Sequence, residues 1–402
     1  MGAKHVRKWA SLLVAALMFL SLLLAGCGSP AAKNQTESST DNSSKPAVHS
    51  NQDEFTVQQP AGSKVDLTSY YKQYGVTCSV NLTATGGAVT VAGLPKTLPT
   101  PKKKYKIGLA LYTSVDEVGA FVLDGTKKAA AEMGIDLLVN DSNYDQNAQN
   151  QAIEQWILQG VYGVILYPAD FNAVGPILKK LKDAKIPVEA GNPPLVGEVN
   201  SVFMIDNVDI GRKSATLLVD AIKKQQNTDQ PKGLVVEQTL PFQHPNAATR
   251  EAGFMEVMNQ NPGLKVLKLT GVSPEDHYTA FEGALQAHPD IVGGWGLYDS
   301  ALIGMMNARN AAKKTNVLLA GVDNDRQILA AIAKGDIVGS VGYSAYNHAY
   351  WTIDNLVNLL NGAPVPAMIT GPIESITKDN VSDLFKQYYG GKTLEDYLAG
   401  KK

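Results

Sequence analysis

From Lys106 onward, short apolar runs alternate with stretches in which apolar residues recur at helical spacing. Residues 107–111 read Ile-Gly-Leu-Ala-Leu, a run that is too short for a buried helix and typical of a strand covered on both faces. The apolar residues that follow predict a helix, which Gly134 is placed to end. No other feature of the sequence constrains the fold as strongly as this alternation.

The same pattern predicts further elements as far as residue 361. The predicted strands are 107–112, 136–139, 164–166, 186–188, 233–237, 265–270, 291–297, 316–322 and 337–343. The predicted helices are 118–133, 174–181, 208–224, 247–260, 278–287, 300–313, 326–334 and 346–361. A further helix contains Ile153 and ends at Gly160. Alternating strands and helices imply right-handed crossovers and parallel sheets with helices on both faces. About ten strands exceed one core, so we expect two doubly wound α/β lobes.

The first 26 residues have the character of a secretory signal. Lys4, Arg7 and Lys8 precede an apolar run that ends in Leu24-Ala25-Gly26-Cys27. This ending is similar to the lipobox of bacterial lipoproteins, and the resemblance implies that residues 1–26 are removed and that Cys27 is acylated, for example with palmitate. The alternative is a plain anchor helix with an incidental cysteine.

Two segments separate Cys27 from the regular part of the chain. The residues up to position 60 are rich in Ser, Thr, Asn and Asp, and such a composition predicts a disordered tether over 27–60. In the extension 61–104, apolar residues alternate at Val76, Cys78, Val80 and Leu82, and again after Gly86-Gly87. This alternation predicts a small hairpin. With Cys27 acylated, Cys78 is unpaired, and we expect it to be a buried, inert thiol.

Composition excludes several classes of function. Lys and Arg number 36 and Asp and Glu number 38, which gives a net charge of −2. There is no basic excess to neutralise a nucleic-acid backbone. The two cysteines lack the spacing of a zinc site, and the sequence contains neither a phosphate-binding loop nor a nucleophile elbow. We therefore expect a protein that is not an enzyme, binds no metal or cofactor, and acts as a monomer.

The order of short motifs resembles the type I periplasmic sugar-binding proteins over residues 105 to about 375. The motifs that carry this resemblance are Lys106-Ile107-Gly108-Leu109, Gln159-Gly160-Val161, Ile205-Asp206-Asn207, Arg250-Glu251-Ala252-Gly253-Phe254, Asp299-Ser300-Ala301-Leu302 and Gly321-Val322-Asp323. The resemblance implies an N-terminal lobe of 105–206 plus 344–372 and a C-terminal lobe of 207–343 plus 373–402. It also implies a three-segment hinge near Asp206-Asn207, Tyr343-Ser344 and residue 372, with the ligand held in the cleft between the lobes.

Polar residues that follow the predicted strands are the candidates for ligand contacts, because ligands of open parallel sheets bind beyond the carboxyl ends of the strands. Matching the family's motifs places its ligand positions on Asp116, Asn192, Arg250, Tyr298, Asp323 and Tyr343. The Arg250 fork can grip adjacent hydroxyls or a carboxylate. The acidic and amide side chains can accept hydrogen bonds from ligand hydroxyls, and the aromatic rings can cover apolar sugar faces.

Several of these residues also have a purely structural interpretation. Asp323 and Asp299 can each cap the helix that follows. Arg250 can belong to a surface ion pair, and Tyr298 and Tyr343 can be core residues.

The sequence departs from the family at several ligand positions. Val118 and Gly119 stand where sugar binders often have two phenylalanines, and Asn192-Pro193 replaces an aspartate-arginine pair. Tyr298 and Tyr343 replace amide side chains. A hexose or pentose remains the default ligand of the family, and the departures favour a polyol, a modified sugar or a signalling molecule.

These observations predict a lipid-anchored receptor on the extracytoplasmic face of the cell membrane that delivers a small polar ligand to an ABC permease. One alternative is a sensory module for a chemoreceptor or histidine kinase, for example one that binds a furanose-type signal molecule. A second is an interaction protein with a vestigial cleft.

Overall fold

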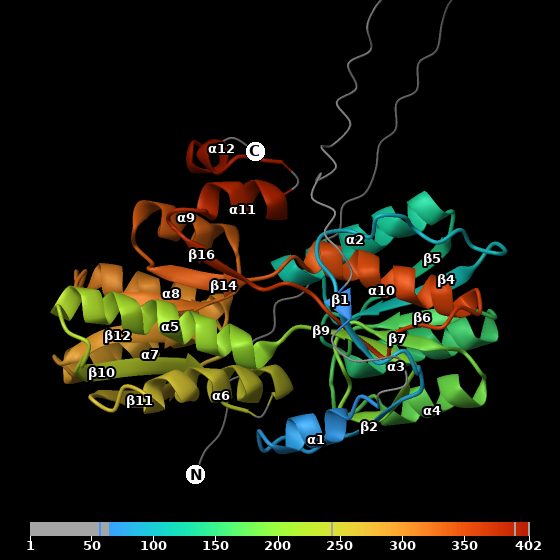
Figure 1. Ribbon diagram of the computed structural model, residues 1–402, viewed down its shortest axis with the longest axis horizontal. Coiled ribbons are helices and arrows are strands. Elements are labelled where there is room, and N and C mark those ends of the chain that lie inside the picture. The colour runs from blue at the N-terminus through green and yellow to red at the C-terminus, as the bar shows by residue number, and fades with distance from the viewer. Residues whose placement is uncertain (1–55, 58–63, 243, 390, 401–402) are drawn as a thin grey trace, which may run out of the picture. The chain divides into compact units, whose positions relative to one another are not determined.

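The computed structural model describes residues 56–57, 64–242, 244–389 and 391–400. The predicted signal segment, the predicted acylation site Cys27 and most of the predicted tether lie outside these residues. The described chain forms two α/β lobes, each built on its own mainly parallel sheet (Figure 1). The predicted fold class is therefore confirmed.

The first lobe is built on an eight-stranded sheet. Its strands lie in the order β1 (Thr56–Val57), β3 (Ala88–Thr90), β15 (Met368–Thr370), β9 (Ser201–Met204), β7 (Val188–Ala190), β6 (Gly163–Leu166), β4 (Lys106–Leu111) and β5 (Asp136–Asp141). All neighbouring pairs are parallel except β1 with β3. Helices α2 (Glu117–Met133) and α10 (Ala345–Leu360) cover one face, and α3 (Gln146–Leu158) and α4 (Gly175–Asp183) cover the other (Figure 1).

The central strand β4 shows why this sheet is buried on both sides. Ile107 and Leu109 point into the core beneath α2 and α10, whereas Ala110 points into the core beneath α3 and α4. Gly108 faces Trp156 so closely that a Cβ atom would lie 2.3 Å from its indole ring. A strand with two buried faces has no polar positions, which explains the short, continuous apolar run in the sequence.

The second lobe is built on a six-stranded sheet in the order β11 (Leu264–Thr270), β10 (Gly233–Thr239), β12 (Ile291–Gly296), β13 (Leu318–Val322), β14 (Gly339–Gly342) and β16 (Glu374–Thr377). Helices α5 (Asn207–Gln226) and α6 (Pro245–Asn259) pack on one face. The other face is covered by α7 (Pro274–Ala287), α8 (Asp299–Ala311), α9 (Arg326–Lys334) and α11 (Val381–Tyr388), and the short helix α12 (Leu394–Leu398) packs beside α11. The edge strand β16 is antiparallel to β14, so this sheet is mixed rather than wholly parallel as predicted.

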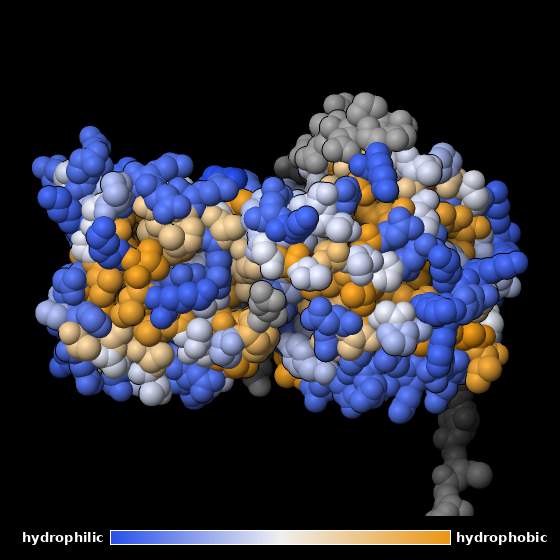
Figure 2. All heavy atoms as spheres, turned by 90° about the horizontal axis from the view of Figure 1, so that it is seen from below, coloured by the Kyte–Doolittle hydropathy of each residue, from blue (hydrophilic) through white to orange (hydrophobic). Residues whose placement is uncertain are grey.

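The chain passes between the two sheets three times. It leaves the first sheet after β9 through Ile205 and Asp206, returns after β14 through Tyr343 and Ser344, and leaves again after β15 through residues 371–373. None of the helices in the described part of the chain has the length and apolar character that a membrane span requires. Figure 2 shows hydrophilic side chains over most of the visible face, with hydrophobic ones in small groups between them.

The predicted hairpin in the extension is wrong. Helix α1 (Leu67–Lys72) leads into β2 (Ser79–Leu82), which pairs in parallel with β8 (Val196–Val199). The second predicted strand, β3, adds to the first sheet beside β15 instead. An isolated two-stranded hairpin is marginally stable, whereas these pairings bury Val80 against α4 and Val89 against β9. Cys78 is buried and unpaired, as expected.

Candidate ligand-binding site

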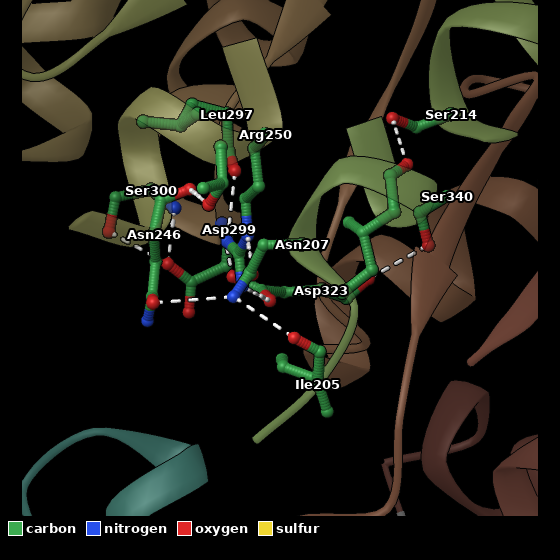
Figure 3. Close-up of polar contacts among 12 residues, drawn as sticks. Ile205, Asn207, Ser214, Asn246, Arg250, Leu297, Asp299, Ser300, Asp323 and Ser340 are labelled. Carbon is green, nitrogen blue, oxygen red and sulfur yellow. Dashed lines mark hydrogen bonds and ion pairs between the residues drawn. The ribbon is translucent and has the colours of Figure 1, made fainter. Parts of the chain in front are cut away.

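Polar side chains gather at the carboxyl ends of the strands in the second sheet. Asp299 follows β12, Asp323 follows β13, and Asn246 and Arg250 lie on α6, which follows β10. The close-up in Figure 3 shows the side chains of these residues together with Asn207 at the start of α5. We refer to Asn207, Asn246, Arg250, Asp299 and Asp323 as the polar cluster.

Arg250 is the centre of the polar cluster, and only 8% of its surface is exposed. Its Nε donates to Asn207 Oδ1 at 2.9 Å, and its Nη1 donates to the carbonyl oxygen of Leu297 at 3.1 Å. Its Nη2 lies 3.7 Å from Asp323 Oδ1. Three neighbours therefore fix the plane of the guanidinium, which rules out the surface ion pair considered from the sequence.

The contact between Arg250 and Asn207 depends on how closely α5 and α6 approach each other. A Cβ atom on Gly211 would lie 1.9 Å from the carbonyl oxygen of Arg250, and one on Gly253 would lie 1.9 Å from that of Val208. Any side chain at either glycine would push the helices apart. The Arg250-x-x-Gly253 spacing in the sequence is thus the local reason that the guanidinium reaches Asn207.

Two carboxylates lie side by side in the polar cluster. The backbone N–H of Asp299 donates to Asp323 Oδ2 at 3.2 Å, and Asp299 Oδ1 accepts from the backbone N–H of Ser300 at 2.5 Å. Burial raises the pKa of Asp323, and Arg250 opposes the rise. Burial and the charge of Asp323 raise the pKa of Asp299. One guanidinium therefore does not compensate both carboxylates.

Asp323 also has an uncommon backbone conformation, with φ at 77°. Aspartate and asparagine tolerate this left-handed region better than most residues. The conformation places the Asp323 carboxylate beside Arg250 and leaves the capping of α9 to Asp325, whose side chain accepts from the N–H of Gln327. The capping role considered for Asp323 is therefore wrong.

On the first lobe, Asp116 is the N-cap of α2. Its Oδ1 accepts from the N–H of Gly119 at 2.7 Å and from the hydroxyl of Tyr112 at 3.0 Å. Its Oδ2 accepts from the hydroxyl of Tyr144 at 2.7 Å. A carboxylate offers about four acceptor positions, so three neutral donors leave little room for a ligand hydroxyl.

Tyr298 presents its ring rather than its hydroxyl. The hydroxyl lies 2.9 Å from Nε2 of His277 and 3.0 Å from the carbonyl oxygen of Val272, both in its own lobe. Burial lowers the pKa of His277 to about 4, so this histidine is neutral near pH 7. With its hydroxyl held in this way, Tyr298 can cover an apolar face of a ligand but is poorly placed to read a ligand hydroxyl.

Tyr343 and Asn192 differ in their relation to the polar cluster. Burial and then the charge of Asp323 raise the pKa of Tyr343, and Arg250 opposes the rise, so Tyr343 lies within electrostatic reach of both. Tyr343 also lines a cavity of about 320 Å³ against the three crossing segments. Asn192 lies after β7, and within the described residues no hydrogen bond or ion pair links it to the polar cluster.

Two of the contacts between the lobes lie beside these residues. Arg326 Nη2, at the start of α9, lies 2.5 Å from Glu117 Oε1, at the start of α2. The hydroxyl of Tyr389 donates to Glu117 Oε2 at 2.6 Å. Elsewhere, the rings of Phe171 and His244 meet edge to face with their centroids 4.9 Å apart. Glu117 directly follows the predicted ligand position Asp116, and His244 is the N-cap of α6, the helix that carries Arg250.

Several residues of this region were not predicted from the sequence. Asn207 was assigned only to the hinge, although its position directly after a crossing segment also suits a contact with Arg250. Tyr112 and Tyr144 follow strands β4 and β5 of the first lobe, so their position after a strand end was an available signal. His277 lies inside α7, and nothing in the sequence pattern indicates its contact with Tyr298.

Comparisons with known proteins agree with this architecture. The periplasmic binding protein domain family matches residues 107–364. A ribose import binding protein of Bacillus subtilis (strain 168) is 24% identical over 281 residues, which cover 69% of this chain and 88% of that protein. A xylitol-binding protein of Mycolicibacterium smegmatis is 24% identical over 321 residues, covering 76% and 87%.

Among solved structures, an ABC transporter periplasmic solute-binding protein from Actinobacillus succinogenes 130z with bound D-allose is similar to this chain. The TM-score is 0.64 at 20% identity, and the match covers 70% of this chain and 100% of that chain. The family match begins at residue 107, after α1, β2 and β3.

The excess of carboxylates in the polar cluster predicts that Asp299→Asn stabilises the ligand-free protein. The Asn oxygen can still accept from Ser300. A carboxyl whose pKa rises on folding stabilises the fold at low pH and loses that contribution as the pH rises through the raised pKa. We expect the gain in unfolding free energy to be on the order of 1–2 kcal/mol larger at pH 8 than at pH 5, measured by urea denaturation.

Asp136→Asn, at an exposed carboxyl on β5, is the matched control and should change stability equally at both pH values. A loss of stability in Asp299→Asn at pH 8 would contradict the expectation.

Proposed function

Because the chain belongs to the periplasmic binding protein domain family, we propose that it captures a sugar or polyol outside the cytoplasm and delivers it to an ABC importer. It is a binding protein and not an enzyme. The polar cluster is the single observation on this chain that best supports the ligand-binding role. A buried guanidinium and two carboxylates at the strand ends form a group that a polyhydroxylated molecule can satisfy.

The chemistry of the polar cluster fits the ligands named for its relatives. A ribose import binding protein and a xylitol-binding protein are similar in sequence, and a similar solved structure holds D-allose. All three ligands present several hydroxyl groups in a row. Arg250 can donate to ligand oxygens while Asp299, Asp323 and Asn246 accept from hydroxyls. Removing a hydroxyl would leave one of these buried groups unpaired, which is the physical basis for selectivity.

Closure of the two lobes is the proposed mechanism of capture. Three crossing segments provide a hinge, and a ligand held between Asp116 and the polar cluster touches both lobes only when they are together. Binding then shifts the population toward the closed form by its differential affinity for that form. The contact of Glu117 with Arg326 and Tyr389 belongs to the closed form in this proposal, and the permease recognises surfaces of both lobes at once.

Attachment to the membrane is proposed to occur through lipid on Cys27. The support is the similarity of Leu24-Ala25-Gly26-Cys27 to the lipobox and the basic residues that precede the apolar run. The chain between Cys27 and the first lobe would then link the binding lobes to the extracytoplasmic face of the membrane, where the permease lies.

Ligand capture predicts binding of at least one sugar or polyol that depends on Arg250. We expect a calorimetric screen of ribose, allose, xylitol, inositol and glycerol to give a ligand that Arg250→Ala weakens at least tenfold, because the fork makes charge-assisted hydrogen bonds of about 1.5–3 kcal/mol. Arg212→Ala, which removes an arginine paired with Glu256 on the surface of the second lobe, should bind normally. Circular dichroism checks that both variants fold. Equal affinity in Arg250→Ala would remove this residue from the site.

The closure mechanism predicts that Arg326→Ala weakens ligand binding without touching the ligand. Loss of the ion pair with Glu117 removes a contact made only between lobes, and an exposed pair is worth up to about 1 kcal/mol, so we expect a loss of affinity of about threefold. Lys268→Ala breaks the pair with Glu251 inside the second lobe and is the matched control. If both variants bind as the unmodified protein does, this contact does not stabilise the closed form.

Lipid attachment predicts that Cys27→Ala releases the protein from membranes. We expect the unmodified chain to sediment with the membrane fraction of its host and to incorporate labelled palmitate, and the variant to do neither. Cys78→Ala serves as the control for loss of a thiol. Continued sedimentation of Cys27→Ala with membranes would contradict the lipobox interpretation.

A further inference from the structure

Carboxyl groups outnumber cationic side chains where the two lobes meet. Asp116 lies on the first lobe and Asp299 and Asp323 lie on the second. Arg250 is the cation of this group. Burial and the charge of Arg250 lower the pKa of His244 to about 4, so this neighbouring histidine adds no charge near pH 7. Arg326 is already paired with Glu117 at 2.5 Å.

The three carboxylates belong to one site although they come from two lobes. Burial raises the pKa of Asp323, and Asp116 adds to the rise from the opposite lobe. Burial and Asp116 likewise raise the pKa of Tyr144, and Asp299 adds to that rise from the opposite lobe. The geometry agrees: Glu117, which follows Asp116, lies 2.5 Å from Arg326, which is three residues after Asp323. A ligand held between the lobes at this place therefore lies near carboxylates of both lobes.

The carboxylates of this site already accept hydrogen bonds, but few cationic groups lie near them. Asp116 accepts from two tyrosine hydroxyls and one backbone N–H. Asp299 accepts from the backbone N–H and the hydroxyl of Ser300. These donors are neutral, and Arg250, whose Nη2 lies 3.7 Å from Asp323 Oδ1, is the cation paired with the cluster. Burial and the charge of Asp323 raise the pKa of Asp299 to about 7, so Asp299 carries a proton part of the time near neutral pH, and a nearby ammonium group would favour its ionised form. A buried carboxylate without a counter-charge is unfavourable.

Tyrosine rings accompany the carboxylates. The hydroxyls of Tyr112 and Tyr144 are directed to Asp116, and their ring centroids lie 5.5 Å apart. The Tyr298 hydroxyl is held inside the second lobe, and Tyr144 has 61% of its surface exposed. With the hydroxyls engaged, ring faces and edges remain for the ligand, and electron-rich faces attract cations.

We propose that the ligand carries a protonated amine on a hydroxylated carbon skeleton, as in an amino sugar or an aminopolyol. The ammonium group lies against Asp299 and the tyrosine rings and supplies the missing positive charge, while the hydroxyls bind Arg250 and Asn246. The proposal rests on the proposed function and narrows it from neutral sugars and polyols to their cationic amino derivatives.

Matched pairs of ligands test the proposal on the folded protein. The pairs are D-glucosamine with D-glucose, D-galactosamine with D-galactose, and 1-amino-1-deoxy-D-glucitol with D-glucitol. Each is titrated calorimetrically at pH 6.5 and in 50 and 300 mM NaCl. We expect the amine to bind at least tenfold more tightly than its neutral partner in at least one pair, and the preference to shrink at the higher salt concentration, because the attraction is between charges.

Asp299→Asn and Asp136→Asn are the variants for the same titrations. Both remove one negative charge, but Asp136 is exposed on β5. We expect the ratio of amine to neutral affinity to fall below threefold in Asp299→Asn and to stay at its original value in Asp136→Asn.

The outcomes separate the proposal from the proposed function. If neutral sugars or polyols bind as tightly as their amines, the proposal of a cationic ligand is wrong and the sugar- or polyol-binding function stands. The same holds if the neutral compounds bind and the amines do not. An amine preference that Asp299→Asn and Asp136→Asn reduce equally also overturns it, since general surface charge would then explain the preference. If neither the amines nor the neutral sugars and polyols of both screens bind, the result counts against the cationic ligand and against the proposed function.

Discussion

The hydrogen bond between Arg250 and Asn207 organises the rest of the site. It requires α5 and α6 to pack at the distance that Gly211 and Gly253 permit. It fixes the guanidinium plane so that a third nitrogen faces Asp323, and Asp323 in turn accepts from the backbone of Asp299. Glycines on two helices thereby determine which atoms face the opposite lobe. A rigid, buried cation is pre-organised to bind a ligand with little further ordering of the protein.

Much of the fold could be predicted because its strands are buried on both faces. A run such as Ile107-Gly108-Leu109-Ala110-Leu111 is typical of a strand covered on both faces, and the helices between such runs show regular apolar spacing. Elements that lack either signal were missed. Strands β15 and β16 have three and four residues. The partners of β15 lie more than 100 positions earlier in the sequence, and β16 pairs antiparallel with β14, which lies more than 30 positions earlier. The extension was misread for the same reason, because β2 and β3 alternate as a hairpin would but bury their side chains against separate parts of the first lobe.

The sequence predicted which residues of the candidate site lie together better than it predicted their hydrogen bonds. Arg250, Asp323, Tyr298 and Tyr343 follow strand ends, and position alone brings them to the junction of the lobes. Hydrogen bonding decides what each can do, and that depends on neighbours such as Tyr112, Tyr144 and His277. These neighbours use the oxygens of Asp116 and the hydroxyl of Tyr298. A residue type in the sequence states which bonds are possible, whereas only the packing shows which of them are already made.

The buried carboxylates of this site lower the stability of the ligand-free protein and raise its affinity for a suitable ligand. Asp299 and Asp323 raise the free energy of the ligand-free protein, since burial disfavours both charges and one guanidinium cannot balance them. A cationic ligand on the second lobe removes part of that penalty, and Asp116 of the first lobe adds its own negative charge when the lobes come together. The same unfavourable electrostatics would therefore oppose closure of the empty lobes and favour closure around a cation, which couples ligand charge to the conformation that an importer recognises.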